Sequence, residues 1–218
     1  MINENHFMRQ WGIIHPDKLT MPILMVGAGN IGSWTALALM KLGCTNVTVI
    51  DFDSVEEHNV GSQLYTSLDI GETKVDAMNK RLGFLTENLP HTEVRKFDPT
   101  LPLDAFDIVI SAVDSIAVRK DLFTALKGTT KLLVDGRMGG NSISIYTIPM
   151  GDAEKVALYE DTLFDAADAL PIPCSERSVV YNCFIMAGYI TDVVAHIANE
   201  QPIPPEIELD LINFTLFT

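Results

Sequence analysis

The chain has 218 residues, of which 47% are hydrophobic and 20% are charged, a composition typical of one globular domain with a substantial core. Its 29 acidic and 15 basic residues give a formal net charge of −14. This charge argues against non-specific binding of nucleic acid or of anionic membranes, because both need a basic face.

The chain begins with an arm or short helix over residues 1–21, followed by a strand from Ile23 to Val26. The next residues, Gly27-Ala28-Gly29-Asn30-Ile31-Gly32, match the pattern G-x-G-x-x-G. Apolar residues at helical spacing follow up to Gly43, which is a typical helix stop. A second strand, Val47 to Ile50, ends on Asp51. This order predicts a nucleotide-binding βαβ unit.

Further elements alternate in the same way. A polar loop over residues 53–59 leads to a predicted helix over 71–82, and Lys74 lies near the start of that helix. Residues 93–97 predict a weak third strand. The run 106–113 is strongly apolar, as expected of a parallel strand buried on both faces, and it ends on Asp114.

Residues 115–126 predict a helix, and residues 131–134 predict a strand that ends in Asp135-Gly136-Arg137. Residues 140–148 alternate between apolar and polar types, which is typical of an antiparallel strand. We therefore expect an α/β fold with a doubly wound, mainly parallel, Rossmann-like sheet that antiparallel strands continue.

The last third of the chain is harder to interpret. Residues 150–171 are acidic and poorly periodic, so we expect a surface excursion, and a long helix should begin at Ser175. Residues 206–217 alternate and then change phase, which suggests a β-bulge in a terminal edge strand.

We expect a single domain over residues 1–218. Its parts are an N-terminal arm (1–21), a nucleotide-binding core (22–148), a crossover loop (149–174) and a C-terminal helix and strand (175–218).

The chain shows no sign of export or of membrane insertion. Cys44, Cys174 and Cys183 are widely spaced, which excludes a disulfide framework and a four-cysteine zinc site within the chain. The N-terminal residues have no apolar run, so we expect a cytoplasmic protein. Polar residues interrupt the apolar stretch 179–198, which indicates a buried core helix and not a membrane span.

Three residues outside the glycine loop point to phosphate chemistry, and each has a simpler alternative. Asp51 suits a ribose hydroxyl, Asp114 suits Mg²⁺, and Lys74 suits a phosphate group. The alternative role of either aspartate is that of a helix cap, and the alternative for Lys74 is a solvated helix residue. The glycine loop and Asp51 alone fit an NAD-dependent oxidoreductase equally well.

Four ordered blocks separate these alternatives: GAGNIGS, VIDFDSVEEHNVGSQ, DIGETKVDAM and DIVISAVDSIAVRKDL. Together they resemble the ThiF/MoeB/ubiquitin-activating superfamily over about residues 22–148. The resemblance implies ATP- and Mg²⁺-dependent adenylation of the C-terminal carboxylate of a small ubiquitin-like or sulfur-carrier-like protein. It favours ATP over NAD, because it gives Lys74 and Asp114 a role.

The resemblance also implies a role for individual residues. The loop glycines Gly27, Gly29 and Gly32 would pack against the phosphates, Asp51 would bind the ribose, Lys74 would contact the phosphates and Asp114 would hold Mg²⁺. The same nucleotide site would include Asn30, Asp53, Asn59 and Gln63. Arg9 resembles an arginine that reaches into the partner subunit's site, which implies a homodimer.

Two features concern catalysis. The family pattern has an arginine at the position of Ser62, so either another cation, Arg137 or else Arg177, takes its place, or the chain is a non-catalytic nucleotide-binding subunit. Cys174 precedes the expected long helix, where some relatives carry a thioester-forming or persulfide-forming cysteine and others a cysteine they do not need. Cys174 is therefore a candidate catalytic thiol or an inert cysteine.

Overall fold

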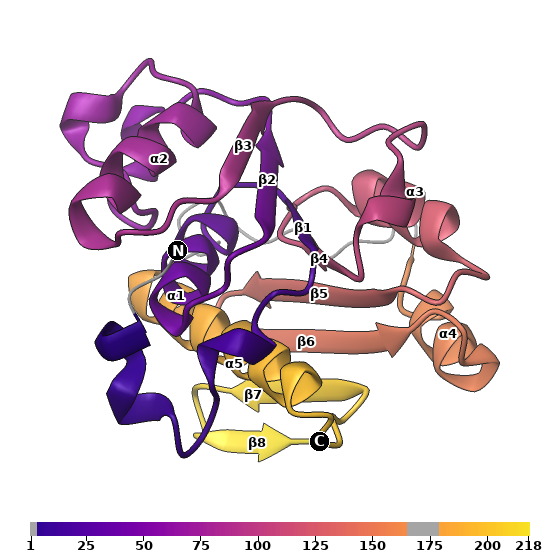
Figure 1. Cartoon of the computed structure of the whole chain (residues 1–218). Coiled ribbons are helices and arrows are strands. Elements are labelled where there is room, and N and C mark those ends of the chain that lie inside the picture. Colours follow the sequence, from indigo (N-terminus) through magenta and orange to yellow (C-terminus); the bar gives the residue numbers. More distant parts are fainter. Residues whose placement is uncertain (1–3, 165–178) are drawn as a thin grey trace.

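The structure is a computed structural model that describes residues 4–164 and 179–218. One eight-stranded sheet runs through the molecule in the order β3-β2-β1-β4-β5-β6-β7-β8 (Figure 1). Helices cover both of its faces in the parallel half.

The first five strands are parallel and form the doubly wound half of the sheet. They are β1 (Ile23–Val26), β2 (Val47–Asp51), β3 (His91–Val94), β4 (Ile108–Ser111) and β5 (Leu132–Gly139). All residues of β1 and β4 are buried, which explains why every residue of the two strands is apolar except Ser111, the last residue of β4. The predicted fold class is confirmed, although β3 begins two residues earlier than expected.

Three antiparallel strands continue the sheet: β6 (Ser142–Pro149), β7 (Glu206–Asp210) and β8 (Thr215–Phe217). The expected bulge near the C-terminus is wrong, because a tight turn separates β7 from β8. The carboxylate of Asp210 caps this turn by accepting from the backbone N–H of Ile212 at 2.9 Å, and Phe214 has a φ of 52°. The turn, and not a bulge, reverses the chain and shifts the apolar phase.

The helices divide between two cores, one on each face of the sheet. The α-helices are α1 (Gly32–Leu42), α2 (Lys74–Leu85), α3 (Ile116–Leu126), α4 (Ala153–Glu160) and α5 (Val180–Ala198). Short 3₁₀ helices span Glu4–Gln10, Pro16–Lys18, Glu57–Asn59, Ser67–Asp69 and Leu103–Ala105. α1, α2 and α5 bury their apolar residues on one face, and α3 and α4 bury theirs on the other.

Helix α5 begins at Val180 and not at Ser175. Val179 is extended, with a φ of −135°, and precedes the first helical residue. α5 is long and apolar enough to span a bilayer by length and composition, with 50% of its apolar window buried. Met186 and Ile190 pack against the sheet, so burial in the core accounts for its apolar sequence.

Helix α4 lies within the segment that was expected to be an irregular surface excursion. Asp152 caps it by accepting from the backbone N–H of Glu154 and Lys155, at 3.2 and 3.3 Å. Val156 and Tyr159 are buried against the sheet. Two inward residues on an eight-residue helix give too weak a periodicity to predict it.

A buried ionic cluster joins the ends of β4 and β5. Arg119, on α3, donates to the Asp135 carboxylate, to the carbonyl of Gly136 at 3.1 Å and to the carbonyl of Val113. Arg137 Nε donates to the other Asp135 oxygen at 2.7 Å. Because Asp135 is fully buried, this carboxylate and its two arginines hold the carboxyl edge of the sheet together.

Candidate functional site

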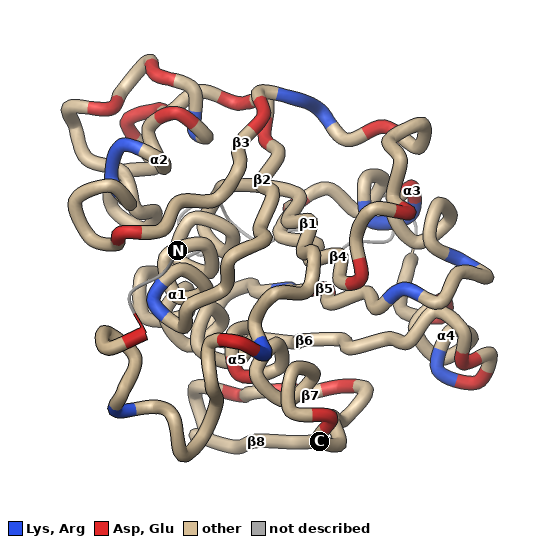
Figure 2. The backbone as a smooth tube through the Cα atoms, in the orientation of Figure 1, with Lys and Arg blue, Asp and Glu red and all other residues tan. Residues whose placement is uncertain are grey.

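The predicted site residues lie along one edge of the parallel sheet. The glycine loop follows β1, Asp51 ends β2, and Asp114 follows β4. Because these strands are parallel neighbours in the sheet, their carboxyl ends meet at the same edge. Figure 2 shows acidic residues on many of the loops with basic residues among them, in line with the negative net charge.

Each oxygen of the Asp51 carboxylate accepts a hydrogen bond from a backbone N–H group. Its Oδ2 accepts from the N–H of Ala28 at 2.6 Å, and its Oδ1 accepts from the N–H of Asp53 at 2.7 Å. Asp51 thus fixes the glycine loop after β1 to the loop after β2. It ends a strand, so the alternative that it caps a helix is wrong. Each carboxylate oxygen keeps a second lone pair for a ribose hydroxyl.

Two of the three loop glycines are required by the protein itself. Gly27 has a φ of 102°, and a Cβ there would lie 2.6 Å from the carbonyl oxygen of Ala112. A Cβ on Gly32 would overlap the carbonyl of Gly27. In contrast, a Cβ on Gly29 would meet nothing within 4 Å, and its φ is not in the left-handed region. Gly29 therefore leaves free space at the start of α1, which fits the close approach of a phosphate group.

Two alanine substitutions separate these roles. We expect Gly29→Ala to leave the free energy of unfolding within about 0.5 kcal/mol of the wild type, while it weakens ATP binding because the methyl group fills the phosphate space. In the matched variant Gly32→Ala the free energy of unfolding should fall by about 2 kcal/mol or more, because the added methyl group overlaps the backbone. Urea unfolding and calorimetric ATP titration measure both effects. Equal ATP affinity in Gly29→Ala and wild type would contradict this assignment.

Lys74 is held in place before any nucleotide arrives. It is the first residue of α2, and Thr73 caps the helix by accepting from the N–H of Asp76 at 3.3 Å. Lys74 Nζ lies 2.7 Å from Asp53 Oδ2, and its backbone N–H donates to the carbonyl of Asp53 at 2.9 Å. The side chain is largely buried, so it is not a solvated helix residue.

Asp114 is exposed, and no hydrogen bond or ion pair links it to the described residues. The cap of α3 is Ser115, whose Oγ accepts from the N–H of Val118 at 3.4 Å, so the capping alternative is wrong for Asp114 also. In residues 4–164 and 179–218 no cluster of three or more metal-ligating side chains occurs. Mg²⁺ commonly takes one or two carboxylates together with substrate phosphates, so a lone carboxylate fits an ion that accompanies ATP.

Asn59 and Gln63 are buried beside this edge. Asn59 Oδ1 accepts from the N–H of Glu56 at 2.9 Å, so Asn59 helps to shape the loop. The backbone N–H of Gln63 donates to the carbonyl of Asn59 at 2.9 Å. Gln63 Oε1 is buried and has no partner in the described part of the chain. A buried acceptor without a donor fits a site that a ligand completes.

Two aromatic residues that support the glycine loop were not among the predicted site residues. Tyr65 donates from its hydroxyl to the carbonyl of Ala28 at 2.6 Å, and Trp34 Nε1 donates to the carbonyl of Ser62 at 2.7 Å. Burial, with smaller contributions from nearby carboxylates, raises the pKa of Tyr65, so it stays a neutral donor. Their only signal in the sequence is position, since each follows a predicted motif by a few residues.

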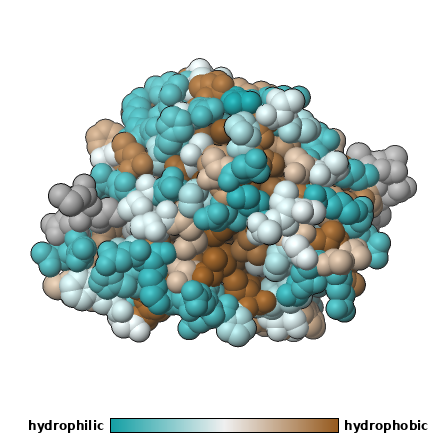
Figure 3. All heavy atoms as spheres, turned by 45° about the vertical axis from the view of Figure 1, so that its right-hand side comes forward, coloured by the Kyte–Doolittle hydropathy of each residue, from teal (hydrophilic) through white to brown (hydrophobic). Residues whose placement is uncertain are grey.

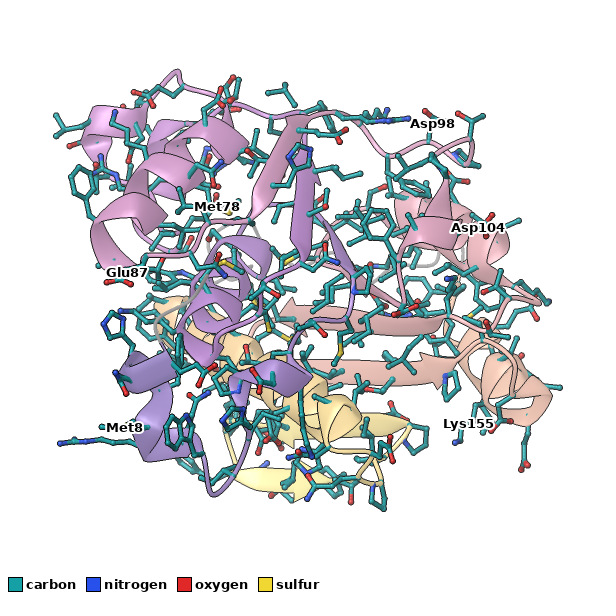
Figure 4. All side chains as sticks on the ribbon, viewed as in Figure 1. Met8, Met78, Glu87, Asp98, Asp104 and Lys155 are labelled. Carbon is teal, nitrogen blue, oxygen red and sulfur yellow. The ribbon has the colours of Figure 1, made fainter. Side chains whose placement is uncertain are left out.

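The remaining predicted residues lie elsewhere. Arg9 is exposed on the 3₁₀ helix that packs against the end of α1, where Gln10 Nε2 donates to the carbonyl of Leu42 at 2.7 Å. α1 is 11 residues long, so this end lies roughly 16 Å from the glycine loop. In Figure 4, Met8, in this arm, lies on the other side of the molecule from Asp98, which follows β3.

Arg137 and Cys174 were candidates for catalysis. Arg137 donates to Asp135 and to Thr162, and its guanidinium lies 4.5 Å from the centre of the Tyr146 ring. We therefore do not assign it the role of the missing arginine. Cys174 and Arg177 lie outside the described residues.

Comparison with known proteins identifies the class to which this fold and site belong. The ThiF family matches residues 16–216, so the chain belongs to that family. The chain is 33% identical over 119 residues to "Adenylyltransferase and sulfurtransferase MOCS3" of Aedes aegypti, covering 52% of this chain and 27% of that protein. It is 29% identical over 138 residues to the molybdopterin-synthase adenylyltransferase of Escherichia coli strain K12, and this match covers 60% of this chain and 55% of that protein.

A solved structure supports the fold over nearly the whole chain. The crystal structure of Escherichia coli MccB with AMPCPP and MccA superposes with a TM-score of 0.78 at 16% sequence identity. The match covers 99% of this chain and 71% of that one. The chain spans only about a quarter to a half of these curated relatives.

Proposed function

We propose that this chain adenylates the C-terminal carboxylate of a small ubiquitin-like or sulfur-carrier-like protein, called the carrier below, with ATP and Mg²⁺ as the other reactants. The proposal rests above all on one observation: the open space over Gly29 lies at the same sheet edge as Asp51, Lys74 and Asp114. Family membership and the names of the adenylyltransferase relatives support the reaction type.

In this proposal each group has its own task. The loop amides at the start of α1 and Lys74 would bind the phosphates, while Asp51 would orient the ribose. Asp114 would hold Mg²⁺, which offsets phosphate charge when it is bound. The carrier carboxylate is already ionised at neutral pH, so no general base is needed for its attack on the α-phosphate. Pyrophosphate leaves, and an acyl-adenylate results.

We propose further that the active form is a homodimer in the cytoplasm, to which Arg9 contributes across the subunit interface. The distance between Arg9 and the glycine loop of its own chain supports a role in a second copy. The net charge of −14 disfavours nucleic acid and membranes as partners. Figure 3 shows hydrophobic residues near the centre of one face with hydrophilic residues around them, an arrangement that suits a protein partner.

The experiment that tests this proposal is ATP–pyrophosphate exchange in the presence of candidate carriers. We expect exchange that depends on both carrier and Mg²⁺. ATP binding without exchange, even with the cognate carrier, would instead favour a non-catalytic subunit. Calorimetry separates the other alternative: NAD binding tighter than that of ATP·Mg²⁺ would favour an oxidoreductase.

A further inference from the structure

Ser62, which stands at the family's arginine position, forms a hydrogen bond with the glycine loop. Its Oγ donates to Asn30 Oδ1 at 2.8 Å, and its carbonyl accepts from Trp34 Nε1 at 2.7 Å. Both contacts are partly buried and span about thirty residues of sequence. Two bonds therefore hold Ser62 against the loop and the first turn of α1.

This contact fixes the orientation of the Asn30 side chain. An asparagine amide carries an acceptor oxygen and an NH₂ donor group on the same carbon. Because the Ser62 hydroxyl donates to Oδ1, the Nδ2 donors point away from Ser62. Nδ2 donates no hydrogen bond to residues 4–164 or 179–218. Asn30 is partly exposed, two residues before the first helical residue, Gly32.

Three described cations near this edge are already paired. Lys74 is bonded to Asp53, and Arg119 and Arg137 share the carboxylate of Asp135. The amide of Asn30 is thus a free donor on the residue that follows Gly29, and a Cβ on Gly29 would meet nothing within 4 Å. The helix N-terminus adds its own N–H groups at the same place.

We propose that Asn30 donates a hydrogen bond to the phosphates of the nucleotide, and that Ser62 is a positioning residue that acts through Asn30. This inference rests on the proposed ATP site and names a donor within it. A neutral amide stabilises an anion less than a guanidinium does, so the chain would bind ATP while carrying less positive charge at the transition state.

The decisive variant is Asn30→Asp. An aspartate keeps an acceptor for the Ser62 hydroxyl but replaces the NH₂ donor with an anionic oxygen. We expect the Kd for ATP·Mg²⁺ to rise about tenfold or more, since hydrogen bonds to charged groups are among the stronger ones. The Kd for adenosine, which has no phosphate, should change less than about twofold, and the unfolding temperature should stay at the wild-type value.

Variants at Ser62 test the positioning role. Ser62→Ala removes the hydroxyl and should raise the Kd for ATP about threefold or more. Ser62→Thr keeps the hydroxyl, so its Kd for ATP should equal that of the wild type. Calorimetric titration with ATP·Mg²⁺ and with adenosine measures all four proteins, and thermal unfolding verifies that each folds.

The outcomes are distinct. The role of Asn30 would be overturned if Asn30→Asp bound ATP as tightly as the wild type, or if its affinity for ATP and its affinity for adenosine fell equally. Either result would leave the proposed function standing. If the wild-type protein binds no ATP, the proposed function fails and this inference fails with it.

Discussion

Replacing Asp114 with alanine is expected to lower carrier-dependent ATP–pyrophosphate exchange about a hundredfold to a thousandfold, a loss typical of removing one group that stabilises charge in a transition state. Asp114 is the exposed carboxylate at the end of β4, and it makes no described hydrogen bond. Its replacement therefore removes the proposed metal ligand but no structural contact. The unfolding temperature should equal that of the wild type.

The matched control is Asp121→Ala. Asp121 is also exposed and lies on α3, seven residues further along the chain. The two variants change the net charge equally, so any general electrostatic effect on ATP binding should be similar. Exchange in Asp114→Ala at the level of Asp121→Ala would contradict the assignment of Asp114 as the Mg²⁺ ligand.

Replacing Asp135 with alanine is expected to lower the free energy of unfolding by about 3–5 kcal/mol, because it leaves charged arginines buried without their shared partner. Asp135 is fully buried, and the Arg119 side chain is only 7% exposed. Tyr159, which donates to Asp135 at 3.0 Å, would lose its acceptor as well. Urea unfolding at neutral pH measures the change.

A surface pair provides the control for this loss. Glu160 lies 2.7 Å from Lys127, and both side chains are about half exposed. We expect Glu160→Ala to cost less than about 1 kcal/mol, since solvent screens exposed pairs. Similar losses in both variants would show that burial of the Asp135 cluster contributes little to stability.

The parallel half of the fold could be predicted from the sequence because its signals are local. The run at 106–113 is mostly apolar, as expected of a strand buried on both faces, and the loop from Gly27 to Gly32 joins a strand to a helix. Local signals fail further along the chain. The turn between β7 and β8 depends on Asp210 as a cap and on an unusual φ at Phe214, and neither produces a clear sequence pattern.

The position of the site was predictable to a similar extent. Parallel topology alone places Asp51 and Asp114 at one edge, so their neighbourhood follows once the strands are known. The side-chain contacts that shape the glycine loop could not be predicted from the sequence. Ser62 reaches Asn30 across 32 residues, and Tyr65 reaches Ala28 across 37. Side-chain contacts at such separations come from tertiary packing, which motifs and periodicity do not encode.

The central claim is that the chain activates a free C-terminal carboxylate, and the most direct measurement compares two forms of the same carrier. One form ends in a free carboxylate, and the other ends in an amide. With ATP and Mg²⁺, we expect ATP–pyrophosphate exchange and a carrier–AMP adduct, detected by mass spectrometry, with the free carboxylate alone. Equal exchange with both forms, or an adduct on the amidated carrier, would contradict the claim.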